Sequence, residues 1–170
     1  MRKFFAYFTP VVLTFAIGAL GYYLQGEALQ EWYPYLIKSS MTPPAVVFPV
    51  VWSVLYLLIG LSAGTMLVRG DMGVMRLWLL QLLLNFLWSV CFFALRSPFL
   101  GFLVILALDV VVLAYIFHTM GRRPAAAWLF APYMLWLIFA TYLNGYICIN
   151  NQREIVEIVV EKSVQKNAFL

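Results

Sequence analysis

Charged residues are scarce in this 170-residue sequence: they make up 11% of it, against 65% hydrophobic residues. An ordinary soluble domain carries about 25% charged residues, so this chain cannot cover a water-facing surface. The composition therefore excludes a soluble enzyme with a polar exterior, and it also excludes a disordered chain. The net charge is +4, and the basic residues are scattered rather than gathered into the stripe of a nucleic-acid-binding protein. No nucleic-acid partner is expected.

Residues that bind metals or act as nucleophiles are also scarce. The two cysteines, Cys91 and Cys148, both lie within apolar runs, and the single histidine, His118, has no obvious second ligand. Without a C-x-x-C or Cys/His cluster, neither a zinc site nor a disulfide framework is expected, and haem ligation is unsupported. No phosphate-binding loop or nucleophile–base pair is visible. The sequence therefore predicts no metal site and no cofactor.

Long apolar runs dominate the chain instead. Each run reaches about the 18–20 residues that a helix needs to cross the hydrocarbon core, and none alternates in polarity as a barrel strand does. We therefore predict an all-α membrane protein with a single bundle of five transmembrane helices. These helices are expected near residues 4–24, 44–68, 77–95, 98–119 and 126–149. The first run follows two basic residues as a signal peptide does, but its length and the lack of a clear cleavage site favour a retained helix.

Two segments fall outside these helices. The bundle is expected to occupy residues 1–152, followed by a polar tail at residues 153–170. The connection at residues 25–43 is too long for a simple turn and contains Trp32 and Tyr33. Amphipathic aromatics favour the membrane interface, so this loop is either an interfacial anchor or a lid over a cavity.

The distribution of basic residues predicts an orientation. Six of them gather on the amino-terminal side of the bundle: Arg2, Lys3, Arg69, Arg76, Arg122 and Arg123. The opposite side has Lys38 and Arg96 in its loops, followed by a tail of mixed charge. The positive-inside rule then places the amino terminus in the cytoplasm and the tail outside.

Polar and aromatic residues recur at helical spacing on three of the predicted helices, and residues three or four apart share a helix face. The stripes are Pro49, Trp52, Ser53 and Tyr56; Gln81, Asn85, Trp88 and Phe92; and Tyr133, Trp136, Ala140 and Asn144. Amides in hydrocarbon need partners, so these faces point inward, either as contacts between helices or as ligand contacts. Facing aromatic stripes would form a slot that suits a flat, apolar ligand.

Two further features lie within the runs. Asp109 is near the centre of the fourth helix, where a charge is unfavourable, so it is expected to be protonated or paired. It is either functional or a neutral acid that hydrogen-bonds to a neighbouring helix. Gly60 and Gly64 form a G-x-x-x-G pattern that allows close helix approach, either within the chain or in a dimer.

Three sequence blocks resemble the TspO family, also called the tryptophan-rich sensory protein, translocator protein or peripheral benzodiazepine receptor family. The blocks are Thr42-Pro43-Pro44 with Pro49-Val-Val-Trp52-Ser-Val-Leu-Tyr56; Gln81-Leu-x-x-Asn85-x-x-Trp88-Ser-x-x-Phe92-Phe93; and Pro132-Tyr133-x-x-Trp136-x-x-Phe139-Ala140-x-x-Leu143-Asn144, closing with Asn150. The resemblance covers about residues 4–151. It departs at Met41, where the family has a tryptophan, and the tail after Gln152 has no counterpart.

The resemblance implies five helices around a cavity that the first loop caps. It also implies an apolar ligand of tetrapyrrole or sterol type, such as protoporphyrin IX, and a homodimer in the lipid bilayer. Residues implied to bind the ligand are Trp32, Pro43, Pro44, Trp52, Tyr56, Gln81, Asn85, Trp88, Phe92, Tyr133, Trp136, Phe139, Ala140 and Asn144. Sterol binding is less well supported, because six residues separate Tyr146 from Arg153 where the sterol pattern allows five at most.

Three functions remain open from the sequence. The first is a ligand-binding sensor or carrier for tetrapyrroles. The second is an enzyme that degrades porphyrin in light, in which the resemblance implies catalytic roles for Trp52 and Trp136; such chemistry would rest on the ligand itself. The third is a transporter of porphyrin or sterol, although the sequence has neither an internal repeat nor paired broken helices.

Overall fold

A computed structural model describes residues 1–151, and the tail predicted at residues 153–170 lies outside them. The elements in order are α1 (Arg2–Glu31), the short 3-10 helix η1 (Tyr33–Tyr35), α2 (Val47–Leu67), α3 (Met72–Ser89), the π-helical turn η2 (Val90–Ala94), α4 (Pro98–Met120) and α5 (Pro124–Asn150). The five long helices, with α3 continued by η2, are each long and apolar enough to cross a membrane. They confirm the predicted fold class.

Two helix boundaries differ from the sequence expectation. α1 runs to Glu31 rather than ending near residue 24. Charged residues do not break a helix, and the last turns of α1 are fixed by Ala28, which is buried against Leu36 and Phe92. α3 begins at Met72 rather than near residue 77, because the carboxylate of Asp71 accepts a hydrogen bond from the Val74 amide at 3.3 Å and caps the helix.

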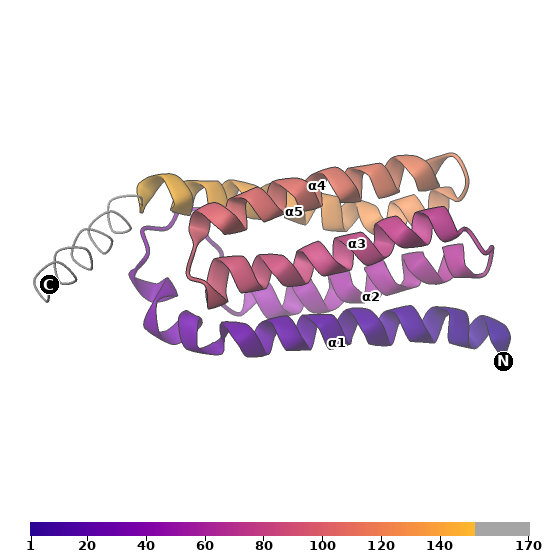
Figure 1. Cartoon of the computed structure of the whole chain (residues 1–170), viewed down its shortest axis with the longest axis horizontal. Helices are drawn as coiled ribbons and strands as arrows, with labels where there is room; N and C mark the ends of the chain where they lie inside the picture. Colours follow the sequence, from indigo (N-terminus) through magenta and orange to yellow (C-terminus); the bar gives the residue numbers. More distant parts are fainter. Residues whose placement is uncertain (152–170) are drawn as a thin grey trace, which may run out of the picture.

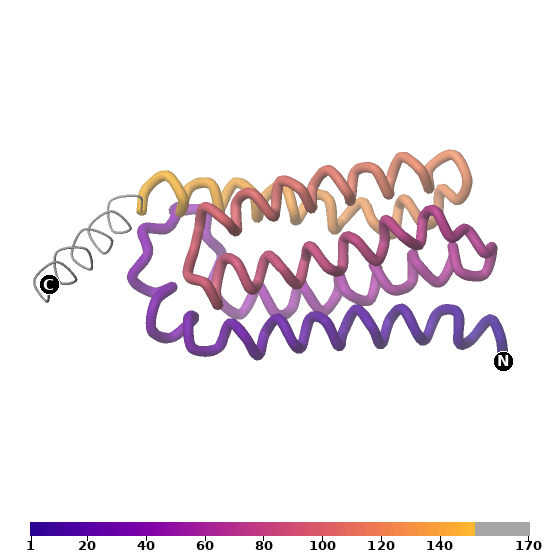
Figure 2. The backbone as a smooth tube through the Cα atoms, viewed as in Figure 1, coloured from indigo at the N-terminus to yellow at the C-terminus, as the bar shows by residue number. Residues whose placement is uncertain are grey.

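The helices pack side by side as a ring. Contacts join α1 to α2, α2 to α5, α5 to α4, α4 to α3 and α3 back to α1. Figure 1 shows the amino terminus at one end of the bundle, and the connection between α1 and α2 at the other end, beside the last turn of α5. The tube in Figure 2 shows that this connection crosses the end of the bundle from α1 to α5 before it enters α2.

The close packing of α1 on α2 depends on the glycine pattern of α2. A Cβ atom on Gly60 would lie 2.5 Å from the Cα atom of Val11, and one on Gly64 would overlap the ring of Tyr7. Thr14 of α1 adds a hydrogen bond to the Tyr56 carbonyl at 2.9 Å. Of the two readings of Gly60 and Gly64, the structure therefore supports packing within the chain.

Large apolar side chains cover the outside of the bundle. They include Phe8 on α1, Leu57 on α2, Leu83 on α3, Val110 on α4 and Ile138 on α5, all exposed in the isolated chain. Because water would not favour such a surface on every helix, these faces contact lipid. The chain is an integral, multi-pass membrane protein.

Candidate ligand-binding site

The first aromatic cluster joins three helices in the interior. Trp52 stacks on Tyr56 of the same helix, with ring centroids 5.3 Å apart, and meets the edge of Tyr133 at 6.1 Å. Asn85 connects both tyrosines: its Oδ1 accepts from the Tyr56 hydroxyl at 3.3 Å and its Nδ2 donates to the Tyr133 hydroxyl at 3.1 Å. Trp52, Tyr56, Asn85 and Tyr133 of the predicted stripes on α2, α3 and α5 thus meet. The other two residues of the α2 stripe, Pro49 and Ser53, are exposed rather than turned inward, and the Ser53 hydroxyl donates to the Pro49 carbonyl of its own helix.

A second cluster lies nearer the η1 end. Trp88 stacks on Phe92 with centroids 5.4 Å apart, and Trp32 meets the edge of Phe92 at 5.6 Å. The indole nitrogen of Trp88 donates to Asn144 Oδ1 at 3.0 Å, and Asn144 Nδ2 donates to the Pro98 carbonyl at 2.9 Å. This cluster joins α3, α5 and the residues that follow α1.

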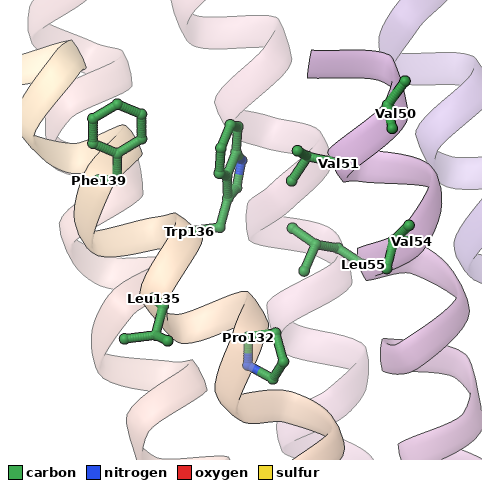
Figure 3. A pocket seen from close by; sticks show the side chains of 8 residues that line it. All are labelled: Val50, Val51, Val54, Leu55, Pro132, Leu135, Trp136 and Phe139. Carbon is green, nitrogen blue, oxygen red and sulfur yellow. The ribbon is translucent and has the colours of Figure 1, made fainter. Parts of the chain in front are cut away.

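Trp136 stands apart from both clusters. Its ring meets Phe48 at 5.9 Å and Phe139 at 5.7 Å. Together with Phe139 it lines an apolar groove of about 520 Å³ between α2 and α5, shown in Figure 3. Ala140, one turn further along α5, is half-buried against the main core, which Trp52, Trp88 and Trp136 also contact.

Besides the buried indole nitrogen of Trp136, which has no partner within residues 1–151, two polar side chains of the transmembrane region are incompletely paired there. Gln81 on α3 is fully buried, and neither its amide nitrogen nor its oxygen has a partner there. Asp109 on α4 accepts a hydrogen bond from the Thr141 hydroxyl of α5 at 2.8 Å, while its other oxygen has none. The Thr141 contact supports the reading of Asp109 as an acid that hydrogen-bonds to a neighbouring helix.

The segment from Trp32 to Val46, which contains η1, is fastened to the end of α5. The side chain of Asn151 accepts from the Ile37 amide at 2.9 Å and donates to the Ile37 carbonyl at 3.1 Å. Ser39 and Tyr142 share a hydrogen bond of 3.0 Å between their hydroxyls. We call this segment the cap. Residues expected there lie at its two ends: Trp32 in the second cluster, and Pro43 (half-buried) and Pro44 (exposed) just before α2.

Charged side chains make further contacts at this end of the bundle. Lys38 Nζ donates to the carbonyls of Tyr33, Pro34 and Leu36 at 2.8–3.0 Å, and it lies 4.9 Å from the centre of the Tyr33 ring. Burial raises the pKa of the Tyr33 phenol, so this ring stays neutral. Arg96, in the turn before α4, donates to Glu27 at 2.7 Å and ties that turn to α1.

Some contacts at the site were not expected from the sequence. Asn150, which closes the third sequence block, is exposed and donates back to the Tyr146 carbonyl of its own helix. Its neighbour Asn151 holds the cap instead. Tyr142 and Phe48 also lie off the expected stripes. For the role of Asn151, the sequence offered one signal, which is an asparagine near a helix end. This residue type favours helix ends and forms hydrogen bonds from its side chain to the backbone.

The described residues offer no metal cluster. Within residues 1–151, no three His, Cys, Asp or Glu side chains come close enough to hold a metal ion. His118 is exposed, and its Nδ1 atom lies 2.9 Å from the Ala114 carbonyl of its own helix. The interior contacts are therefore aromatic rings, amides and hydroxyls, a chemistry of stacking and hydrogen bonding.

Comparisons with known proteins agree with this geometry. The model of the TspO/MBR family matches residues 10–149. The chain is similar to the tryptophan-rich protein TspO of Archaeoglobus fulgidus, with 36% identity over 83% of this chain and 94% of the relative. It is also similar to the translocator protein of Homo sapiens, with 33% identity over 72% and 75% of the two chains. The tryptophan-rich sensory protein of Cereibacter sphaeroides is 32% identical over 67% and 73%. This chain, with its five membrane helices and its aromatic interior, belongs to the TspO/MBR family.

Proposed function

We propose that this membrane protein binds a flat, apolar ligand of the tetrapyrrole class, such as protoporphyrin IX, and acts as its sensor or carrier. The observation that carries the proposal is the cluster of Trp52, Tyr56, Asn85 and Tyr133. It offers aromatic faces for stacking beside an amide and hydroxyls for the polar atoms of a ligand, the combination found in small-molecule sites. The names of two relatives, a sensory protein and a translocator protein, are consistent with this role.

The second cluster and the cap complete the proposed site. Trp88 and Phe92 extend the aromatic wall toward Trp32, and the cap closes the end of the bundle above them. A planar macrocycle would gain affinity from both clusters, because stacked or edge-to-face aromatic pairs contribute about 0.5–1.5 kcal/mol each beyond their area burial. The sequence alone allowed this segment to be either an interfacial anchor or a lid. In this proposal the cap acts as a lid.

Titration in darkness tests the proposal directly. Purified protein in lipid nanodiscs is titrated with protoporphyrin IX while the tryptophan emission is followed. We expect saturable quenching, because Trp52, Trp88 and Trp136 all lie at or beside the site. If the emission falls only linearly with added porphyrin, as it does for a chain without a site, the proposed function is wrong.

Replacement of Ala140 tests the location of the site. Ala140 is half-buried, four residues after Trp136, and Leu at this position would fill space needed by a macrocycle. A steric conflict of this kind typically costs about 1–3 kcal/mol, which corresponds to a loss of affinity of roughly 5- to 150-fold. Val110→Leu, on the lipid-facing side of α4, is the matched control and should bind as the parent does. A folded Ala140→Leu protein with the parent's affinity would place the ligand elsewhere.

We also propose that the protein forms a homodimer, as the family resemblance implies. The glycine face of α2 is already covered by α1, so the contact between copies would use a different face of the bundle. Exposed apolar side chains remain on every helix for this purpose.

A further inference from the structure

The groove between α2 and α5 opens toward the lipid. The side chains that line it are apolar except for the indole nitrogen of Trp136: they are Val50, Val51, Val54 and Leu55 from α2, and Pro132, Leu135, Trp136 and Phe139 from α5. Val50, Val54 and Leu135 are 60%, 54% and 70% exposed, so its mouth lies on the outer surface of the bundle. The groove exists because short valine side chains on α2 face Pro132, whose ring has no long side chain to fill the space (Figure 3).

The inner wall of the groove is Trp136. In Figure 3 its indole stands between the two helices, with the nitrogen turned toward Val51 of α2. That nitrogen is buried and has no hydrogen-bond acceptor among the described residues. An indole N–H of this kind normally finds a partner when it is buried. The indole N–H of Trp136 can therefore donate a hydrogen bond to an acceptor atom of a bound molecule.

The groove lies beside the first aromatic cluster, whose residues do not line it. Tyr133 lies three residues before Trp136 on α5, and Trp52 lies one turn after Phe48, the ring that Trp136 touches on α2. A rotation of the Trp136 side chain would thus join the groove to the stack of Trp52 and Tyr56. Pro132 lies inside α5 and removes one backbone hydrogen bond just below this point. Local adjustment of α5 is easiest at such a position.

The cap end of the bundle is closed by comparison. Entry there would require breaking the paired bonds between Asn151 and Ile37 and the bond between Ser39 and Tyr142. It would also bring an apolar ligand through water, where such a ligand is least soluble. A ligand dissolved in the bilayer meets the α2–α5 groove without crossing water.

We propose that the α2–α5 groove is the lateral entrance through which a flat, apolar ligand passes from the lipid to the aromatic clusters, with Trp136 as its movable wall. This inference rests on the proposed function, because it takes the ligand of that function as the occupant. The indole N–H of Trp136 offers one hydrogen bond to an acceptor atom of the ligand during passage. Residues at the groove mouth, such as Val54, then control the rate of exchange and not the affinity.

The test compares binding rates in nanodiscs in the dark, with protoporphyrin IX as the probe. Val54→Phe places an aromatic ring in the groove. Val110→Phe places the same ring on the outer face of α4, where Val110 is 68% exposed. We expect Val54→Phe to slow both association and dissociation by about tenfold or more, as a barrier higher by roughly 1.4 kcal/mol would. Its equilibrium affinity should stay within about twofold of the parent, because an entrance affects both directions equally. Val110→Phe should change neither rate.

A reversible block guards against misfolding of the phenylalanine variant. Val54→Cys in a Cys148→Ser background leaves Cys91, which is buried, as the remaining native thiol. A bulky methanethiosulfonate reagent at position 54 should slow exchange, and a reductant should restore the parent rates in the same sample.

The outcomes separate the two proposals. Absence of saturable binding to the parent protein overturns the proposed function itself. Binding with unchanged rates in both blocked proteins overturns the entrance and leaves the function standing. Loss of affinity without slower exchange also overturns the entrance, because the groove would then be the binding site.

Discussion

Several polar residues inside the bundle, though not Gln81, are paired across helices. Asn85 bonds to Tyr56 and Tyr133, Asn144 bonds to Trp88, and Ser62 shares a hydrogen bond of 2.9 Å with Tyr115. Hydrogen bonds between membrane helices contribute on average about 0.6 kcal/mol each. Their larger effect is on register, because a slipped helix would leave an amide or a hydroxyl unsatisfied in hydrocarbon.

Asp109 provides a prediction at this scale. Its side chain lies in the membrane-spanning part of α4, and no basic side chain forms an ion pair with it among residues 1–151, so a protonated carboxyl group is expected. Asp109→Asn keeps the acceptor for Thr141, so folding and most of the porphyrin affinity should be retained. Infrared spectroscopy at pH 7 should show a protonated carboxyl band that is absent from the variant. A carboxylate band that disappears with the substitution would contradict the protonated form.

The residues that could be predicted from the sequence share one property: they repeat along a helix. Asn85, Trp88 and Phe92 follow a period of three to four, which indicates a common face, and the structure brings them into contact with other parts of the bundle. Phe48 and Asn151 could not be found in this way. Each depends on where one helix end lies beside another, which is set by packing between distant segments and not by local spacing.

At the scale of helices, the apolar runs predict that each helix exists but not where it ends. The five runs predicted the five helices because hydrocarbon requires about 20 apolar residues per crossing. The ends were less predictable because α1 extends beyond the apolar run as far as Glu31. Those last turns are stabilised by contacts that only the folded chain provides: Ala28 against the second cluster, and Glu27 with Arg96.

The α1–α2 contact gives a prediction at the same scale. Gly60→Ala would place a methyl group 2.5 Å from the Cα atom of Val11, so α1 must move away from α2. Overpacking of this kind typically costs about 1–3 kcal/mol. We expect a corresponding decrease in the free energy of unfolding, measured in mixed detergent micelles by tryptophan emission.

The matched control for this substitution is Gly26→Ala. Gly26 is inside α1, and nothing lies within 4 Å of a Cβ atom placed on it. Alanine there should be neutral or stabilising by up to about 1 kcal/mol, since it has the higher helix propensity. Equal stability of the two variants would show that α1 does not depend on the glycine face of α2.

For the whole molecule, five successive crossings place alternate connections at opposite ends of the bundle. The amino terminus, the α2–α3 turn and the α4–α5 turn share one end, while the cap and the last turn of α5 share the other (Figure 1). The end of the bundle that holds the amino terminus carries Arg69 and Arg122. Arg122 also forms an ion pair with Asp71 at 2.8 Å. Asp71 neutralises only part of this positive charge, so the asymmetry that was read from the sequence remains in the fold.

This asymmetry predicts the orientation in the membrane. Because cytoplasmic loops carry the excess of Lys and Arg, the amino terminus and the α4–α5 turn should face the cytoplasm, and the cap should face the opposite side.

Cysteine labelling measures this orientation. Cysteine is introduced at Tyr35 in the cap, which is 77% exposed, or at Gly121 in the α4–α5 turn, where nothing lies within 4 Å of a Cβ atom. In intact cells, a membrane-impermeant maleimide should label Tyr35→Cys and should reach Gly121→Cys only after the cells are opened. The Cys148→Ser protein without an added cysteine measures the background from buried Cys91. Labelling of Gly121→Cys in intact cells, with Tyr35→Cys protected, would reverse the orientation. It would also move the cap, and the mixed-charge residues that follow Asn151, to the cytoplasmic side.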